Sequence, residues 1–266
     1  MTTAAVPRAT LRQSVIGLAL AAAIFGAWLS VHLWAMFVFR ITATSWPLVP
    51  FIFALQCWLS VGMFIVAHDA MHGSLMPVAP KAGQAIGAVL LFLYAGFGWR
   101  RMRDAHFAHH RHTGTADDPD FHAGNPRDFW PWYAQFLRRY FGILSYLWVH
   151  AVVLTYYFAF AVAPENIALL YGFPAIASSL QLFYFGTYRP HRHEAVAAQQ
   201  GMPEAEFPDR HRARTNDYGS IASLFSCFHF GYHHEHHLHP GTPWWALPER
   251  HRDYVKTHAM TKAAIS

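Results

Sequence analysis

The sequence predicts an all-α fold, an integral membrane helical bundle with a histidine-rich cap on its cytosolic side. Of the 266 residues, 54% are hydrophobic and only 13% are charged, about half of the roughly 25% found in soluble domains. There are also 20 histidines, as many as Lys and Arg together. At this length we expect a single domain over residues 1–266.

Four apolar segments predict membrane-spanning helices. Residues 15–39 contain no formal charge over 25 residues, which as a helix cover about 37 Å and exceed the roughly 30 Å hydrocarbon core. This segment is too long for a signal-peptide core, so we expect it to be retained. Residues 47–67 form the second span, and residues 141–163 and 167–187 form the third and fourth. We expect two transmembrane hairpins, the second of them connected at Pro164-Glu165-Asn166.

Residues 83–99 are apolar but only 17 residues long, near the lower limit for a span. A full crossing at this point would separate the histidines before it from those after it. We therefore expect a short interfacial or re-entrant helix.

The positive charges predict the orientation. With four crossings, 19 of the 20 Lys and Arg residues fall on one side, and only Arg40 falls on the other. Because cytoplasmic loops retain an excess of Lys and Arg, this side is cytoplasmic. We expect a multi-pass membrane protein with both termini in the cytoplasm. Eighteen histidines share that side, while His32 and His150 lie within spans.

Several classes of cofactor and partner are excluded by composition and motif. Two cysteines cannot build a disulfide framework, an all-cysteine zinc site or an iron–sulfur cluster. No glycine-rich nucleotide motif is present, so we expect no built-in flavin. The pI near 9.3 comes from Arg and Lys between apolar segments, which indicates membrane lipids rather than nucleic acid as partners.

The histidines form three clusters, each on one face of a predicted helix. Side chains three or four residues apart are neighbours on a helix, about 5–6 Å apart at Cβ. Three such clusters on one side of a membrane offer eight convergent nitrogen donors, which predicts a metal site. The clusters are His68 and His72; His106, His109 and His110; and His233, His236 and His237.

The number and type of donors indicate the metal. A structural zinc ion takes four ligands, whereas eight imidazoles without cysteine suit two ions that prefer octahedral coordination. We therefore expect the site to bind iron, with coordination positions left open for dioxygen. Catalytic zinc would need a base such as that of HExxH, which is absent.

Other polar residues are candidates to orient the ligands or to replace one. A carboxylate that accepts the second ring N–H of a ligating histidine fixes its orientation and raises its basicity. His229 shares the face of His233 and is a reserve ligand, while His112, His234 and His239 lie off the ligand faces. The carboxylate candidates are Asp69, Asp104, Asp117, Asp118, Asp120 and Glu235.

Nearly the whole chain resembles the membrane histidine-box di-iron superfamily of fatty-acid desaturases and hydroxylases and, within it, the bacterial β-carotene ketolase family. The boxes indicate the superfamily, and the last stretch is typical of the ketolases. The resemblance rests on HDAMHGSL (68–75), HFAHHRHTGTADDPDFH (106–122), FGTYRPHR (185–192), FPDRHRAR (207–214) and FHFGYHHEHHLHPGTPWWALP (228–248).

The resemblance implies two non-haem iron ions, O2 as co-substrate, and no flavin or haem. It implies the eight box histidines as ligands. Alkane hydroxylases of the superfamily carry a further histidine between a span and the last box, and this implies His191 as a ninth ligand.

The resemblance also implies the reaction, a 4,4'-ketolation of β-ionone rings. β-Carotene would give echinenone and canthaxanthin, and zeaxanthin would give astaxanthin. The same boxes would serve carotenoid hydroxylation or fatty-acid desaturation or hydroxylation, which remain alternatives. A metal transporter is a further alternative, but transporters place ligands near mid-bilayer, where only His32 and His150 lie.

Substrate and electron donor follow from the aromatic and basic residues. We expect Phe97, Trp99, Phe183 and Tyr184 to contact the carotenoid polyene. Arg100, Arg101 and Arg103 suit an acidic, reduced ferredoxin-type donor, because complementary charge accelerates encounter. Binding of anionic lipid headgroups is the alternative role for these arginines.

Overall fold

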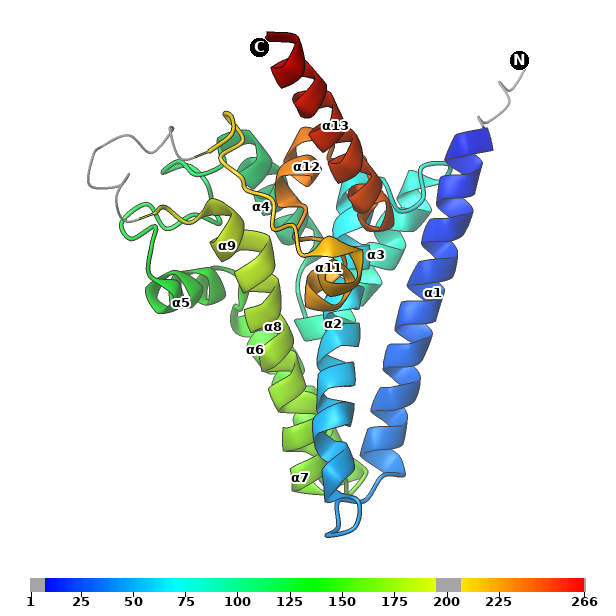
Figure 1. Cartoon of the computed structure of the whole chain (residues 1–266). Coiled ribbons are helices and arrows are strands. Elements are labelled where there is room, and N and C mark those ends of the chain that lie inside the picture. The colour runs from blue at the N-terminus through cyan, green and yellow to red at the C-terminus, as the bar shows by residue number, and fades with distance from the viewer. Residues whose placement is uncertain (1–7, 195–206, 266) are drawn as a thin grey trace. The chain divides into compact units, whose positions relative to one another are not determined.

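The computed structural model describes residues 8–194 and 207–265, with side chains described up to residue 257. Over these ranges the secondary structure is helical and includes no strand, which confirms the predicted all-α class. Figure 1 shows the elements in chain order. The chain forms two compact units. The helical unit is Met1–Arg103 with Phe136–Gln181, and the histidine unit is Asp104–Gln135 with Leu182–Ser266.

Two long helices form the centre of the helical unit. Helix α1 (Arg8–Phe37) lies side by side with α2 (Val49–His72), which follows a short 3-10 turn, η1 (Trp46–Leu48) (Figure 1). The C-terminal end of α1 and the N-terminal end of α2 pack against α7 (Pro164–Ile167) and the π-helical turn η3 (Ala168–Gly172). A core of buried apolar side chains joins these elements, and it includes Ala35, Met36, Ile52, Ile167 and Leu170.

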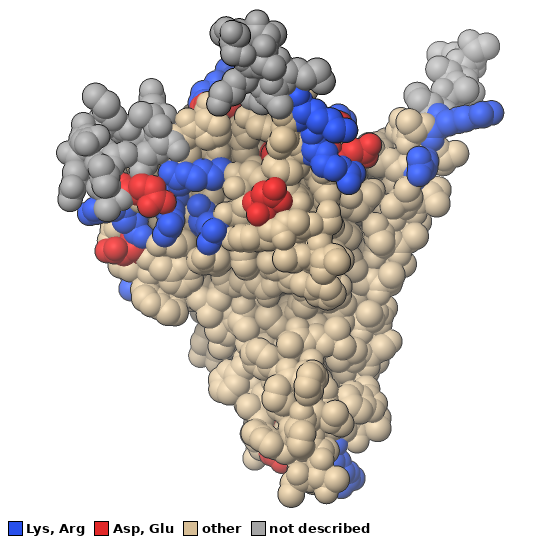
Figure 2. All heavy atoms as spheres, viewed as in Figure 1, with Lys and Arg blue, Asp and Glu red and all other residues tan. Residues whose placement is uncertain are grey.

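Three helices are long and apolar enough to cross a membrane: Arg8–Phe37, Trp46–His72 and Pro164–His191. They contain the predicted spans 15–39, 47–67 and 167–187, except for two residues at the end of the first. In Figure 2 the lower part of the surface, around α7 and the lower parts of α1 and α2, shows no charged side chains apart from one basic and one acidic patch at its tip. The composition of these helices therefore supports a membrane protein.

The predicted span 141–163 is shorter in the structure. It comprises α6 (Ile143–Leu154) and the π-helical turn η2 (Thr155–Ala159), and it is long and apolar enough for a span only together with the preceding helix, α5 (Phe129–Tyr140). If each bent helix pair is one span, the described chain has up to five spans.

The expected connection at Pro164-Glu165-Asn166 is wrong by a few residues. Pro164 is instead the first residue of α7, and the chain reverses at residues 160–163. Proline suits the first position of a helix because its fixed φ is helical and its missing N–H has no partner there. Within the reversal, Ala161 has φ of 50°, in the left-handed region.

The expected helix at residues 83–99 is α3 (Pro80–Ala95). It ends at Gly96, whose φ of 67° lets its N–H close the last turn, and α4 (Trp99–His112) begins three residues later. A Cβ on Gly87 would lie 2.6 Å from the Trp99 ring and 2.7 Å from the Cβ of Ala70, so this glycine lets α3 approach α2 closely.

The two histidines inside predicted spans have ordinary structural partners. His32 stacks on Trp28 with ring centroids 5.0 Å apart, and its Nε2 lies 2.7 Å from the hydroxyl of Tyr156. The exposed His150 has its Nδ1 2.8 Å from the carbonyl oxygen of Tyr146. Neither histidine belongs to a group of converging metal donors among the described residues.

The histidine unit is built from shorter elements around an aromatic core. Trp132 and Phe183 are almost fully buried and pack with Tyr188. The Trp132 indole N–H donates to the carbonyl oxygen of Asp120, 2.7 Å away, and thereby holds the loop after α4 against α5. Helix α8 (Phe173–Phe183) ends in this unit. The elements described after it are η4 (Tyr184–Tyr188), α9 (Arg189–His191), α11 (Gly219–Cys227), α12 (His233–Leu238), η6 (Trp244–Ala246) and α13 (Leu247–Ile265).

Candidate metal centre

Seven of the nine predicted ligands lie in the histidine unit, on three of its elements. Helix α4 presents the first HxxHH box and α12 the second, and the i, i+3, i+4 spacing places the three imidazoles of each box on one helix face. The π-helical turn η4 leads directly into α9, whose last residue is His191. These histidines form two groups of converging nitrogens.

The first group contains His109, His191, His233 and His237, each at most 3% exposed. Their ligand nitrogens all lie within 4.8 Å of one another. The Nε2 of His191 is 2.9 Å from that of His233, and the Nε2 of His237 is 3.1 Å from that of His233 and 3.3 Å from that of His109. Four buried imidazoles therefore direct the same nitrogen toward one point.

These separations fit a single bound cation. Two imidazole nitrogens at about 2.1 Å from one ion lie about 3.0 Å apart at an octahedral right angle and about 3.4 Å apart at a tetrahedral angle. Burial, followed by the neighbouring histidines, lowers the pKa of His237 well below its usual value. Its nitrogen lone pair is therefore available to a metal at neutral pH.

The second group in this unit contains His106, His110 and His236. The Nε2 of His110 lies 3.2 Å from that of His106 and 3.0 Å from that of His236. These distances also fit nitrogens around one ion. Within the helical unit, His68 and His72 lie one helical turn apart at the end of α2, and their ring centroids are 4.9 Å apart. Their role as ligands stays a prediction.

Asp118 orients His109. The Nδ1–H of His109 donates to the two carboxylate oxygens at 2.9 and 3.0 Å, which leaves Nε2 for the metal. Asp118 is buried and also accepts the backbone N–H groups of Gly114 and Asp120, both at 2.8 Å. Burial alone would raise the pKa of Asp118, but His109 and these two donors hold it below its usual value. The carboxylate stays charged.

His191 is oriented by a backbone group. Its Nδ1–H donates to the carbonyl oxygen of Arg212 at 2.7 Å, so Nε2 faces the four-histidine group. The Arg212 guanidinium in turn donates to the carbonyl oxygen of Gly114 at 3.1 Å, in the loop after the first box. One residue thus ties His191 to the loop that carries Asp118. The sequence pattern alone gave Arg212 no role, although it lies in the quoted FPDRHRAR stretch.

Glu235 supports α12 from behind the ligand face. It is 1% exposed and accepts hydrogen bonds from Thr215 and from the Nδ1–H of His251, the latter at 2.7 Å. Its neighbour His234 lies 2.9 Å through Nε2 from a carboxylate oxygen of Asp209. Neither Thr215 nor His251 belongs to a histidine box or a helix-face pattern. Only their contacts with Glu235 connect them to the second box.

The other residues that were predicted to orient or replace ligands differ in how close they lie to the ligand histidines. Asp120 reaches 4.0 Å from the Nδ1 of His109, and Asp69 lies 3.8 Å from the Nδ1 of His68. Asp117 is exposed. His229 stacks on Trp244 and belongs to neither group of donors among the described residues.

The four predicted substrate contacts lie in different surroundings. Phe183 is 1% exposed in the aromatic core of the histidine unit, so protein covers its ring. Tyr184 accepts a hydrogen bond from Arg189 at 3.0 Å. In the helical unit, Phe97 packs against Tyr94 and Trp99 packs at Gly87.

Comparisons with a family profile and with individual proteins indicate the same family. The profile of the fatty acid desaturase family matches residues 43–158 and 145–264. A β-carotene ketolase from Paracoccus sp. (strain N81106 / MBIC 01143) is 44% identical over 93% of this chain and 96% of its own length. A second, from Paracoccus sp. (strain PC1), is 43% identical over 90% and 93%. A zeaxanthin 4-ketolase from Chlamydomonas reinhardtii is 36% identical over 85% of this chain and 49% of its own length.

The matches extend over both units and include the segments that carry the histidine boxes. The buried, convergent imidazoles are the kind of site that the resemblance implied. The chain belongs to the fatty acid desaturase family.

Proposed function

We propose that this chain is a membrane carotenoid 4,4'-ketolase. The observation that carries the proposal is the 44% identity to a β-carotene ketolase over almost the full length of both chains. The convergent histidine groups supply an oxidation site of the expected kind. β-Carotene is the proposed substrate, with echinenone and canthaxanthin as products. The similarity to a zeaxanthin 4-ketolase extends the proposed substrates to zeaxanthin, with astaxanthin as product.

The proposed cofactor is a pair of iron ions held by the nine histidines, with His68 and His72 included. Bound iron would supply the activation of O2 that hydroxylation of the ring C–H bond needs. The four-histidine group is buried, and burial lowers the pKa of His191 and of His237, so these two imidazoles stay neutral. Asp118 and the carbonyl oxygen of Arg212 hold the Nδ1 protons of His109 and His191, which fixes Nε2 as the ligand atom on both.

At the substrate, the proposed reaction has two oxidations at one carbon. Each converts a C–H bond at ring C4 to C–OH with one O2, two electrons and two protons, and releases one water. The resulting geminal diol loses water and becomes the ketone. Electrons come from a reduced ferredoxin-type protein, for which the exposed Arg100 and Arg101 provide positive charge.

The proposed topology has four spans, with the histidine boxes and both termini on the cytoplasmic side of a bacterial inner membrane. It rests on the distribution of Lys and Arg, of which only Arg40 falls on the opposite side. Membrane lipids surround the spans, and the carotenoid reaches the site from the bilayer.

Product analysis tests the proposal. The chain is expressed in cells that make β-carotene, and extracted pigments are separated by chromatography and identified by mass. We expect echinenone and canthaxanthin, and neither in cells that express the His237→Ala variant. Hydroxylated carotenoids without ketones would show a hydroxylase instead. Unchanged β-carotene with altered acyl chains would show a desaturase or hydroxylase of fatty acids.

A further inference from the structure

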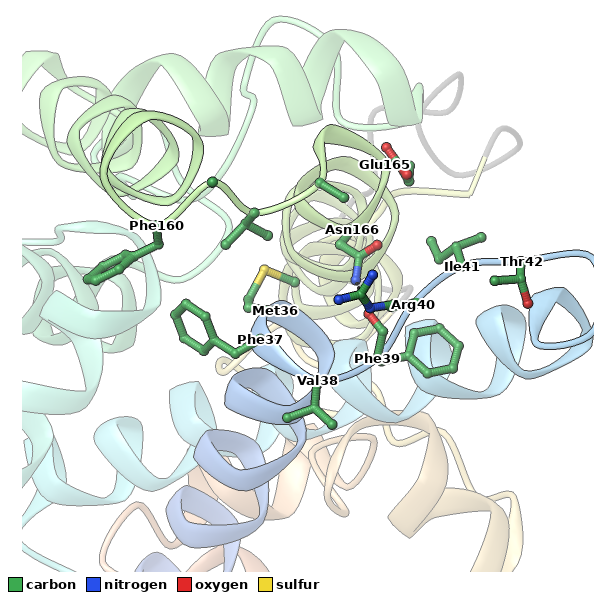
Figure 3. A pocket seen from close by; sticks show the side chains of 13 residues that line it. Met36, Phe37, Val38, Phe39, Arg40, Ile41, Thr42, Phe160, Glu165 and Asn166 are labelled. Atoms are coloured by element: carbon green, nitrogen blue, oxygen red, sulfur yellow. Dashed lines mark hydrogen bonds between the residues drawn. The ribbon is translucent and has the colours of Figure 1, made fainter.

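A pocket lies at the end of the helical unit where two connections between helices meet (Figure 3). Its volume is about 460 Å³. One wall is residues 36–42, where α1 ends, and the other is residues 160–166, where the chain reverses into α7. We call it the Arg40 pocket. All its lining residues belong to the helical unit.

The Arg40 pocket carries one charge of each sign. Arg40 and Glu165 both line it, and both are exposed. Within residues 8–194 and 207–265, no ion pair joins either of them to another side chain. Arg40 is also the one basic residue that the predicted topology places on this side of the membrane. A cation and an anion in one pocket favour a zwitterionic ligand.

The side chain of Asn166 ties the two walls of the Arg40 pocket together. Asn166 is 2% exposed, and its amide N–H groups donate to the carbonyl oxygens of Ala35 and Phe39, both at 2.7 Å. These bonds fix the orientation of the amide, so Oδ1 is the remaining atom, and no hydrogen bond reaches it within the described residues. This oxygen has almost no accessible surface, so a ligand does not contact it. The amide instead holds the start of α7 against the end of α1 and keeps the pocket in shape.

Apart from Thr42, the other side chains that line the pocket are apolar and suit acyl chains. Phe37, Val38 and Phe160 border the pocket, and each exposes about half or more of its surface, at 48%, 66% and 57%. Exposed side chains of this kind at the end of apolar helices contact lipid. The arrangement is therefore a polar recess with an apolar rim, the form of a phospholipid headgroup site.

We propose that the Arg40 pocket binds a phospholipid with a phosphoethanolamine headgroup. The Arg40 guanidinium donates to the phosphate oxygens, for which its planar fork of N–H groups is suited. The primary ammonium donates to the exposed Glu165 carboxylate. One headgroup then places an opposite charge against both Arg40 and Glu165.

Other common headgroups satisfy fewer of these groups. Phosphocholine has no N–H donor, so it cannot hydrogen-bond to the Glu165 carboxylate. Phosphoglycerol has hydroxyl donors but no positive charge to place against Glu165. The proposal therefore predicts discrimination among lipids that share the same phosphate and acyl chains.

Native mass spectrometry of the purified full chain tests this proposal independently of enzymatic activity. The protein is equilibrated with equal amounts of phosphatidylethanolamine, phosphatidylglycerol and phosphatidylcholine of identical acyl chains, and retained lipid is counted. We expect one phosphatidylethanolamine retained with roughly tenfold preference, because hydrogen bonds to charged groups are the stronger ones. The Arg40→Gln variant loses this lipid. The Glu165→Gln variant retains phosphatidylethanolamine and phosphatidylcholine more nearly alike.

The controls replace matching charges that lie outside the pocket. Arg8→Gln and Glu249→Gln remove exposed charges elsewhere and keep the wild-type preference. Equal retention of the three lipids by the wild type would overturn the proposal, as would preferential retention of phosphatidylglycerol. An Arg40→Gln variant that retains phosphatidylethanolamine like the wild type would overturn it as well.

Discussion

Replacing His237 with alanine is expected to abolish ketone formation and to release bound metal. The Nε2 of His237 lies 3.1 Å from that of His233 and 3.3 Å from that of His109, so it is central to the four-histidine group. Replacing a residue that only orients a ligand already costs about 10–100-fold in metal affinity or activity. Loss of the ligand itself is expected to cost at least about 100-fold. Pigment analysis of expressing cells and metal analysis of the purified variant measure both effects.

The matched control is His239→Ala. This exposed histidine follows α12 two residues after His237 and belongs to neither donor group. It is expected to keep wild-type ketone yield and metal content. If the His237→Ala variant formed ketones at the wild-type level, the four-histidine group would not be required for the reaction.

Replacing Asp118 with asparagine is expected to weaken metal binding by about 10–100-fold without unfolding the chain. The carboxylate receives the Nδ1–H of His109 together with the backbone N–H groups of Gly114 and Asp120. An asparagine amide of the same shape has no negative charge and one acceptor atom fewer. His109 is then less basic and less firmly oriented. Competition with a chelator of known affinity measures the loss.

The neighbouring Asp117 provides the control for this change. It is exposed, whereas Asp118 is buried, so Asp117→Asn alters the same net charge without touching His109. Its metal affinity is expected to match that of the wild type. Equal losses in the two variants would show that general charge, rather than the hydrogen bond to His109, controls metal binding.

Much of the helical fold follows from local patterns in the sequence. The apolar segments at 15–39, 47–67 and 167–187 lie in helices long enough to span a membrane, because length and hydropathy are local properties. The end of the third span was harder to predict. The chain reverses at residues 160–163, and Pro164 starts a helix instead of forming the connection, since its residue type suits both a turn and a helix start.

The helix faces that carry the histidines also follow from local spacing. The contacts that orient these histidines do not. The HxxHH spacing places three imidazoles on one face of α4 or α12 whatever surrounds the helix. In contrast, the contact between His191 and the carbonyl oxygen of Arg212 joins residues that are 21 apart in the sequence. The bond from His251 to Glu235 likewise joins α13 to α12. Such pairings depend on tertiary structure, which residue spacing does not encode.

Iron stoichiometry of the purified wild-type chain tests the central claim most directly. The protein is isolated from membranes without added metal, and iron and zinc are measured per chain by inductively coupled plasma mass spectrometry. Two donor groups of histidines predict two iron ions per chain and little zinc. A single zinc ion per chain with no iron would contradict the di-iron centre.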